Sequence, residues 1–420
     1  MKKILILGGG FAGLWSAAGA ARHRAELGLG PDAIEITLVD RNPYHAIRVR
    51  NYEADLNGVT VAFADVLDPI GVKCVAGDVS AINHERQVVD IATSSGQQQL
   101  PYDRLVLALG SELNRPDIPG LREYAFDIDT YAAAARLDVH LASLVGQKSS
   151  PLRNTVLVVG AGLTGIELAA EMPAKLRRLF GTDLLRVILA DSTARIGSDM
   201  GDEAIPVIDE ALATLGVETR VNIAISAIDA SGATLASGER IPTATVVWCA
   251  GMRANPLMAD VPGERDRFGR VPVDDFMRVK SAPNMFAAGD CAWSLIDGTR
   301  ASVMSCQHGR PMGRFAGHNV VADLMGKPML SLRVDWYTTI VDLGEWGAVY
   351  TSGWDRRLLS RGAAAKRTKE IINRERIYPP QTRDRGEILA AAEPAVARPP
   401  QQFPDDSANV QQRVAADSPS

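Results

Sequence analysis

The sequence predicts an α/β protein in which one strand–turn–helix–strand plan is used twice. Two short apolar runs, at residues 3–7 and 34–39, enclose a glycine turn and an alanine-rich helical segment at 14–27. The same order returns later, with a strand, a helix and a strand expected at 155–159, 166–180 and 186–190. This pattern is typical of a βαβ unit, so we expect a parallel sheet in each half of the chain.

Each unit continues in the same way. β-patterned sequence with turn signals follows at 72–109 in the first unit and at 217–247 in the second. Each stretch closes in a strand that meets a glycine, LVLALG at 105–110 and VVWCAG at 246–251. The predicted fold class is therefore α/β, with two Rossmann-like, three-layer domains, β-meander insertions and a small C-terminal region.

Composition excludes several classes of protein. The chain has 420 residues, a net charge of −5 and no basic excess, so we expect no nucleic-acid partner. No run approaches the roughly 18 apolar residues that a membrane-spanning helix needs, and we expect a cytoplasmic protein. The cysteines, Cys74, Cys249, Cys291 and Cys306, are not close in sequence, which predicts neither a redox pair nor a metal site.

The first glycine turn has the spacing of a dinucleotide-binding loop. Gly8, Gly10 and Gly13 lie between a strand and a helix, and Asp40 ends the next strand. Such glycines permit the tight turn and let the backbone approach a pyrophosphate at the helix N-terminus, while the acid accepts hydrogen bonds from a ribose. The strand, the helix and the terminal acid make this signal stronger than a glycine motif alone.

The second glycine turn repeats the pattern with Gly160, Gly162, Gly165 and Asp191. A carboxylate at the ribose would repel a 2′-phosphate, so Asp191 favours NADH over NADPH. Arg195 lies close to Asp191 in the sequence and offers a positive charge for a 2′-phosphate, so NADPH stays open as the alternative.

A third feature, Gly289-Asp290 after the strand NMFAA, completes a recognisable set. The chain resembles the two-dinucleotide-binding flavoprotein superfamily, and is most similar to the type II NADH dehydrogenases, over roughly residues 1–355. The segments that carry the resemblance are GGGFAG (8–13), ALGSELN (108–114), VVGAGLTGIELAAEM (158–172), WCAGMRANP (248–256) and MFAAGDCA (285–292).

The resemblance implies FAD at the first loop and NADH at the second. The FAD contacts expected from it are Gly8, Gly10, Phe11, Ala12, Gly13, Asp40, Arg41, Val79, Ala108, Gly110, Gly289 and Asp290. The NADH contacts expected from it are Gly160, Gly162, Thr164, Gly165, Asp191, Ala250 and Gly251. The domains expected are 1–112 with 284–330 for FAD, 113–283 for NADH (Rossmann core from 151), 331–390 for C-terminal strands and a basic helix, and 391–420 as a disordered tail.

The resemblance also implies a reaction, in which electrons pass from NADH through the flavin to a quinone-type acceptor. Glu167 falls on a family glutamate that lies near the nicotinamide and the flavin, and a role in capping the helix or a solvated position is the alternative. The stretch SVMSCQHG (302–309) departs from the family's Ala-Gln pair and offers only Gln307 and His308. His308 is a candidate proton donor because an imidazole's ordinary pKa is near 6.5. No cysteine lies in 41–63, which excludes disulfide-reductase chemistry.

Two alternatives stay open beside the quinone reductase. One is a soluble reductase for a ferredoxin- or rubredoxin-type carrier, and the other is a flavin- and NADH-binding redox sensor with little turnover. Residues 355–376 carry eight Lys/Arg against three Asp/Glu. This segment predicts either docking on an anionic membrane, at the inner face of the cytoplasmic membrane, or a helix that packs on its own domain. A homodimer is left open.

Overall fold

The first unit forms a five-stranded parallel sheet. The computed structural model describes residues 1–181 and 184–403. The strand order is β21 (Met285–Ala287), β9 (Arg104–Leu107), β1 (Lys2–Leu7), β2 (Ile34–Asp40) and β5 (Lys73–Ala76). The side chains of Ile4 to Leu7 in β1 are all buried, as expected for a central parallel strand that is covered on both faces. The edge strand β21 comes from a part of the chain that follows the whole second unit.

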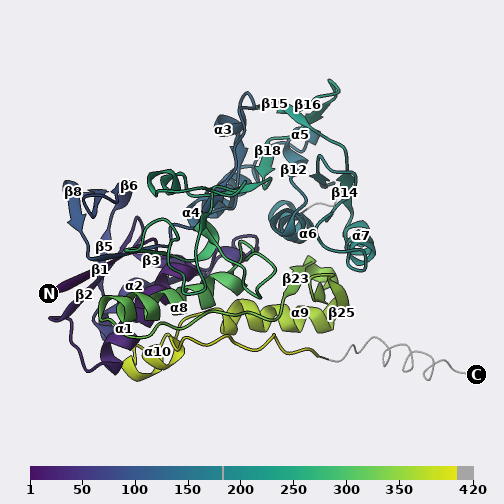
Figure 1. The fold of residues 1–420 in the computed structure, drawn as a ribbon. Helices are drawn as coiled ribbons and strands as arrows, with labels where there is room; N and C mark the ends of the chain where they lie inside the picture. The colour runs from purple at the N-terminus through teal and green to yellow at the C-terminus, as the bar shows by residue number, and fades with distance from the viewer. Residues whose placement is uncertain (182–183, 404–420) are drawn as a thin grey trace, which may run out of the picture.

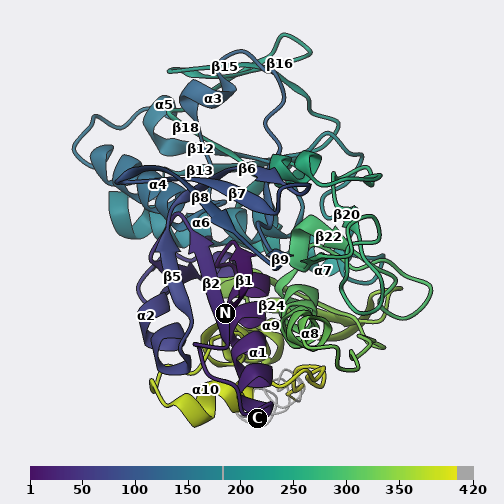
Figure 2. The same ribbon diagram turned by 60° about the vertical axis from the view of Figure 1, so that its left-hand side comes forward.

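The second unit repeats this order strand for strand. Its parallel sheet is β11 (Ala125–Phe126), β18 (Thr245–Trp248), β12 (Thr155–Val159), β13 (Arg186–Ala190) and β14 (Val217–Arg220). In both sheets the strand before the glycine loop is central and the strand that closes the unit lies beside it. Figures 1 and 2 show the two units as separate parts of the molecule, with the N-terminal strands and α1 of the first in purple and most of the second in teal. The predicted α/β class with two Rossmann-type sheets is confirmed.

Three long helices begin next to these sheets. α1 (Phe11–Glu26) follows β1, α6 (Leu163–Phe180) follows β12, and α8 (Cys306–Leu324) packs along α1 (Figure 1). Backbones of α1 and α8 touch because the contact is lined by small residues. A Cβ atom at Gly313 would lie 2.3 Å from the carbonyl oxygen of Ala12, and one at Gly317 would lie 2.2 Å from that of Ser16.

Antiparallel strands connect and extend the two sheets. The meander of the first unit is β6 (Asp78–Asn83), β7 (Val88–Thr93) and β8 (Gly96–Pro101), and that of the second is β15 (Ile225–Asp229), β16 (Gly232–Leu235) and β17 (Arg240–Pro242). β10 (Ser111–Leu113) pairs with β19 (Met252–Ala254), so the segments that follow the two closing glycines lie side by side. The other helices before α8 are α2 (Phe63–Leu67), α3 (Leu121–Tyr124), α4 (Tyr131–Ser143), α5 (Pro151–Asn154) and α7 (Ile205–Thr214).

The C-terminal region is a small sheet followed by helices. It contains β23 (Thr338–Asp342), β24 (Ala348–Ser352), β25 (Arg357–Arg361), α9 (Gly362–Ile371), a π-helical turn (Ile372–Arg376) and α10 (Arg385–Ala391). Of the tail predicted to be disordered, residues 404–420 lie outside the described part. The described part contacts the domain, since Tyr350 and Thr368 donate hydrogen bonds to the carbonyls of Pro400 and Gln401. Among the described residues, none of the helices combines the length and apolar character needed to cross a bilayer.

Candidate functional site

The three glycines of the first loop have three different surroundings. Gly8 has a φ of 95°, and its backbone touches the strand end at Ala108. At Gly13 a Cβ atom would lie 1.7 Å from the carbonyl oxygen of Gly8, so only glycine lets α1 pack this close to β1. A Cβ atom at Gly10 would meet no protein atom within 4 Å. The middle glycine therefore faces open space, as a loop that receives a pyrophosphate requires.

The second loop has the same three surroundings. Gly160 has a φ of 105° and touches Ala250, while a Cβ atom at Gly165 would lie 1.8 Å from the carbonyl oxygen of Gly160. A Cβ atom at Gly162 would again meet no protein atom within 4 Å. Both α1 and α6 begin at this middle glycine, with no side-chain cap and no acidic residue in the first turn. Their free N–H groups and positive helix ends fit an anionic group.

Each predicted ribose acid also holds its own loop in place. Asp40 accepts hydrogen bonds from the backbone N–H groups of Gly9, at 2.7 Å, and Asn42, at 2.8 Å. Asp191 does the same with Ala161, at 2.6 Å, and Thr193, at 2.7 Å. Burial raises the pKa of Asp40, and the hydrogen bonds from Asn42 and Gly9 oppose this. The two acids thus fix the loop geometry, a role that their position at the strand ends did not reveal.

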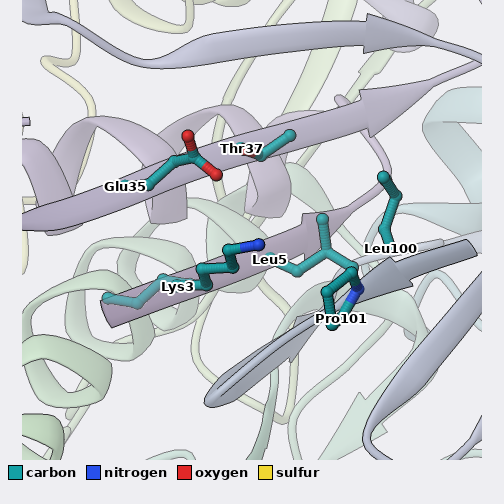
Figure 3. Close-up of a pocket in the computed structure, with 7 residues that line it drawn as sticks. Lys3, Leu5, Glu35, Thr37, Leu100 and Pro101 are labelled. Atoms are coloured by element: carbon teal, nitrogen blue, oxygen red, sulfur yellow. The ribbon is translucent and has the colours of Figure 1, made fainter. Parts of the chain in front are cut away.

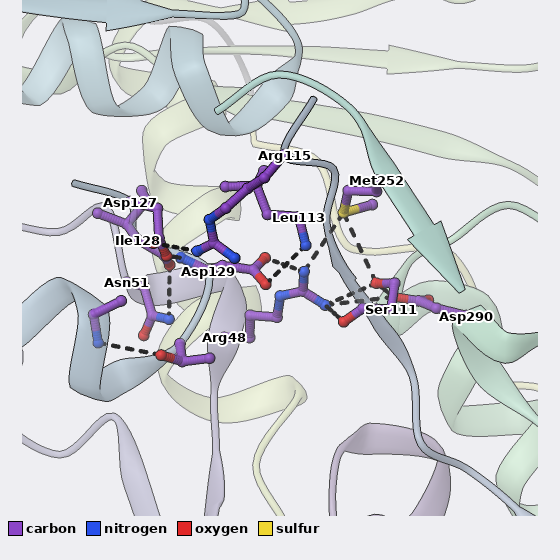
Figure 4. Close-up of polar contacts among 12 residues, drawn as sticks. Arg48, Asn51, Ser111, Leu113, Arg115, Asp127, Ile128, Asp129, Met252 and Asp290 are labelled. Atoms are coloured by element: carbon purple, nitrogen blue, oxygen red, sulfur yellow. Dashed lines mark hydrogen bonds and ion pairs between the residues drawn. The ribbon is translucent and has the colours of Figure 1, made fainter. Parts of the chain in front are cut away.

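Asp290 lies in a polar cluster that joins both units (Figure 4). Ser111 donates a hydrogen bond to Asp290 at 2.7 Å, and Arg48 lies 3.7 Å from the same carboxylate. Arg48 also donates to Ser111 Oγ at 2.9 Å and forms an ion pair with Asp129. Asp129 in turn accepts from the backbone N–H of Leu113 at 3.2 Å. Sequence reasoning found Asp290 but missed Arg48, because its partners lie 63 or more residues away.

The other predicted nucleotide contacts have different surroundings, and among them Gly289 lies at the first loop. Gly289, with a φ of 77°, is so close to Ala12 that a Cβ atom there would lie 2.7 Å from the Ala12 methyl group. Gly110 also has a positive φ, 69°. Arg41 lies at the surface, paired with Asp78 at 3.0 Å, and Val79 packs at the edge of the first core. In the second unit Gly251 has a φ of 76°, while Thr164 is exposed on the first turn of α6.

Glu167 is buried one turn further along α6, in an ion pair with Lys369. The Lys369 Nζ donates to Glu167 Oε1 at 2.6 Å, and the backbone N–H of Asp342 donates to the same oxygen at 3.0 Å. Burial raises the pKa of Glu167, and Lys369 opposes this. Burial would lower the pKa of Lys369, but Glu167 and Asp342 outweigh it, so the pKa of Lys369 is raised.

This pair belongs to a larger buried network. Asp342 accepts hydrogen bonds from Tyr52 at 3.0 Å and from Lys366 at 2.6 Å, and Asn373 donates to Tyr52 at 3.3 Å. Lys366 is the partly exposed end of the network. Burial raises the pKa of Tyr52 well above its ordinary value, and the carboxylates of Glu167 and Asp342 raise it further. Glu167 is thus linked through the backbone N–H of Asp342 to a residue whose carboxylate binds Tyr52 and Lys366, and Lys366 is partly exposed.

Gln307 and His308 lie in the first turn of α8. Gln307 Oε1 accepts from Thr338 at 3.2 Å, while its Nε2 is buried without a partner among the described residues. His308 Nδ1 accepts from the backbone N–H of Val303 at 2.9 Å, so its proton lies on Nε2, which is likewise buried and unpartnered. Burial lowers the pKa of His308 to about 4. The expectation of an ordinary imidazole pKa was wrong, because the sequence could not show this burial.

The cysteines differ in their surroundings, and Cys306 lies next to the candidate site residue Gln307. Cys306 begins α8, close enough to Asp290 and Lys369 for both to act on its charge, and burial raises the pKa of its thiol. All four cysteines are free. Cys74 is exposed on the edge strand β5. The raised pKa keeps the Cys306 thiol protonated near neutral pH, and the thiolate is the nucleophilic form.

A hollow on the first sheet is too small to hold a nucleotide. It measures about 50 Å³ and lies between β1, β2 and β8, lined by Lys3, Ile4, Leu5, Glu35, Thr37, Leu100 and Pro101 (Figure 3). Sites for small organic ligands usually measure about 300–1,000 Å³. The glycine loops, not this hollow, are the candidate nucleotide sites.

Two repeated sheets, each with an uncapped helix and an open glycine loop, define a protein built to hold two dinucleotides. The chain belongs to the pyridine nucleotide-disulphide oxidoreductase family, whose sequence model matches residues 2–313. It is an oxidoreductase of this family.

Three known proteins illustrate the similarity. An NADH dehydrogenase-like protein of Mycobacterium tuberculosis is 51% identical over 94% of this chain and 99% of its own length. A demethylphylloquinone reductase of Synechocystis is 28% identical over 83% of this chain and 86% of its own. The structure of NDH2 from Plasmodium falciparum in complex with NADH superimposes with a TM-score of 0.74 at 13% identity, covering 93% of this chain and 97% of that one. The last likeness concerns the fold.

Proposed function

We propose that the chain is an FAD-dependent NADH dehydrogenase that passes two electrons to a quinone-type acceptor. The first loop, with Asp40 and Asp290, would hold FAD, and the second, with Asp191, would hold NADH. FAD, when bound, supplies the two-electron relay between donor and acceptor. Two relatives support the assignment by name, since one is called NADH dehydrogenase-like and another a demethylphylloquinone reductase.

The observation that carries the quinone assignment is the buried pair of Glu167 and Lys369. A quinone takes up two protons with its two electrons, whereas an iron–sulphur protein accepts electrons alone. Glu167 and Lys369 are proton-bearing groups at the junction of α6, β23 and α9, and the network through Asp342 to Lys366 leads towards solvent. This arrangement suits an acceptor that must be protonated. The unpartnered Nε2 donors of Gln307 and His308 suit an acceptor with carbonyl oxygens.

The experiment separates the two half-reactions. In Glu167→Gln we expect bound FAD and its anaerobic reduction by NADH to be retained, while steady-state turnover with a soluble quinone falls at least tenfold. The matched control is Asp138→Asn. It removes a carboxylate–lysine pair at the other end of α6, where Asp138 pairs with Lys175. Wild-type quinone turnover in Glu167→Gln, or equal loss in both variants, would contradict the proposal.

A reductase for a small iron–sulphur protein is the second candidate. The observation that favours it is Val303, which stands where the resembled family has a glutamine and contributes only its backbone N–H, to His308. A panel of acceptors run on the purified protein decides between them. Turnover that requires an added ferredoxin-type carrier and not a quinone would favour this candidate. Flavin reduction by NADH without rapid reoxidation by either acceptor would favour the redox sensor.

An anionic membrane surface is the proposed partner of the basic segment 355–376, because quinones with long apolar chains reside in the bilayer. The charges available for such docking are fewer than the sequence indicated. Lys366 and Lys369 are turned inward to Asp342 and Glu167, and Arg361 pairs with Glu210 at 3.1 Å.

A further inference from the structure

Two buried histidines face each other where α1 and α8 run side by side, far along both helices from the glycine loop and Gln307. The rings of His23, on α1, and His318, on α8, have centroids 3.8 Å apart and are tilted by 35°. Glu26 lies one turn beyond His23, with its Oε2 3.1 Å from His23 Nδ1. Neither histidine takes part in the nucleotide sites described above.

Both histidines are buried with a ring nitrogen unsatisfied. His23 is 9% exposed and His318 is 8% exposed. His23 Nε2 and His318 Nδ1 have no hydrogen-bond partner among the described residues. Leaving a buried polar group unpaired typically costs about 1–3 kcal/mol, so an unpaired nitrogen on each of two neighbouring rings indicates that a further group belongs there.

We propose that His23, Glu26 and His318 bind one divalent transition-metal ion of the zinc type. Each of the three offers one ligand atom, and these atoms lie within 4.8 Å of one another. Ligands at about 2.0–2.1 Å from a tetrahedral ion are roughly 3.3 Å apart, so small side-chain adjustments bring all three into range. Two imidazoles and one carboxylate suit Zn²⁺ and leave the fourth position to water, whereas Mg²⁺ and Ca²⁺ prefer oxygen ligands alone.

The charged residues around the site affect its affinity for a metal ion. Arg22 pairs with Glu26 Oε1 at 2.7 Å and leaves Oε2 directed at His23. This guanidinium competes with an ion for the same carboxylate. The Glu26 side chain is 41% exposed, which gives an ion a path from solvent to the buried rings. Burial, with His23 and Arg22 nearby, lowers the pKa of His318 to about 4.

Because the three ligands come from two helices, a bound ion would cross-link α1 to α8. The sequence did not suggest this site, since the histidines lie 295 residues apart and no spacing motif joins them.

The experiment measures Zn²⁺ binding to the chelator-treated, flavin-loaded protein by calorimetry. We expect one site per chain in the wild type. His318→Gln and His23→Gln should each weaken binding at least tenfold, because each removes one of only three ligands. Arg22→Gln should strengthen Zn²⁺ binding, since the competing cation is lost. If the two histidines had only a structural role, removing Arg22 would not increase the affinity for Zn²⁺. His84→Gln, in the turn between β6 and β7, is the matched control and should bind like the wild type.

Thermal denaturation gives the second readout. Zn²⁺ should raise the Tm of the wild type in a concentration-dependent way, and Mg²⁺ at the same concentration should not. Flavin absorbance in each variant shows whether it has folded. If correctly folded His318→Gln and His23→Gln bind Zn²⁺ as tightly as the wild type, or if the wild type binds none at micromolar concentrations, the proposal is wrong.

Discussion

Gly10 and Gly162 differ from their neighbouring glycines because a side chain at either position would project into open space. Gly10→Val should therefore fold and lose FAD, because the new methyl groups occupy the space that a pyrophosphate needs. Gly162→Val should keep FAD and raise the KM for NADH at least tenfold. Each variant is the control for the other. Full flavin absorbance in Gly10→Val, or an unchanged KM in Gly162→Val, would show that the loop concerned is not a nucleotide site.

Asp191 should make the enzyme prefer NADH. Both of its oxygens are held by backbone N–H groups beside the second loop, where a 2′-phosphate would be repelled. Arg195, the alternative partner for that phosphate, pairs instead with Asp202 at 3.3 Å. We expect kcat/KM for NADH to exceed that for NADPH at least tenfold, which is about 1.4 kcal/mol. In Asp191→Asn the preference for NADH over NADPH should be smaller. Equal kcat/KM values for the two nucleotides in the wild type would show that the adenosine ribose does not bind at Asp191.

Individual site residues were predictable only where the signal is local. The glycines and the acids at strand ends lie within one βαβ unit, so spacing alone located them. Lys369 pairs with a residue 202 positions away, and Arg48 with partners 63 to 242 positions away. No local pattern marks such residues, because the tertiary fold brings them together. The lowered pKa of His308 results from its burial, and the rings that lie near it, Tyr337 and Trp354, are likewise distant in the sequence.

At the scale of elements, α9 directs two lysines of the basic segment inward. Lys366 and Lys369 are three residues apart and therefore share one helix face, which packs on β23 and α6. The sequence predicted the helix and its charge, but not which charges would be used inside the protein. Within each sheet, the parallel pairing of the two strands of a βαβ unit was predictable, β1 with β2 and β12 with β13, whereas the places of the other strands were not.

Binding to anionic vesicles should reflect only the cations that remain outside. Each Lys or Arg near such a surface contributes roughly 1 kcal/mol. We expect co-sedimentation at low salt that is mostly lost in 1 M NaCl, where the screening length falls to about 3 Å. Arg374→Gln should weaken the binding to vesicles, because Arg374 is exposed, while Lys366→Gln should not, because Lys366 is paired with Asp342. Absence of co-sedimentation at low salt would make the soluble reductase the preferred account.

At the scale of the whole molecule, we expect the folded protein to lose stability in mild acid because of its buried histidines. Burial lowers the pKa of His45 and of His308 to about 4, whereas an unfolded chain titrates near 6.5. Between these values the unfolded state binds more protons, so their contribution is complete above pH 6.5 and is lost as the pH falls towards 4. Each pH unit removes at most about 1.4 kcal/mol per histidine. Thermal denaturation between pH 7 and 5 should show a falling Tm, with a flatter slope in His308→Gln. If Tm falls with pH equally steeply in His308→Gln and in the wild type, His308 does not have the lowered pKa.

The late arrival of β21 has a consequence for biosynthesis. As the chain leaves the ribosome, the second unit emerges as an uninterrupted stretch, whereas the first sheet still lacks its edge at β9. Until residues 285–287 and α8 follow, the unpaired side of β9 and the small-residue face of α1 are exposed to other nascent segments. Folding factors that hold unpaired strand edges should therefore associate most strongly with ribosome-bound chains of intermediate length, and release them once α8 has packed on α1.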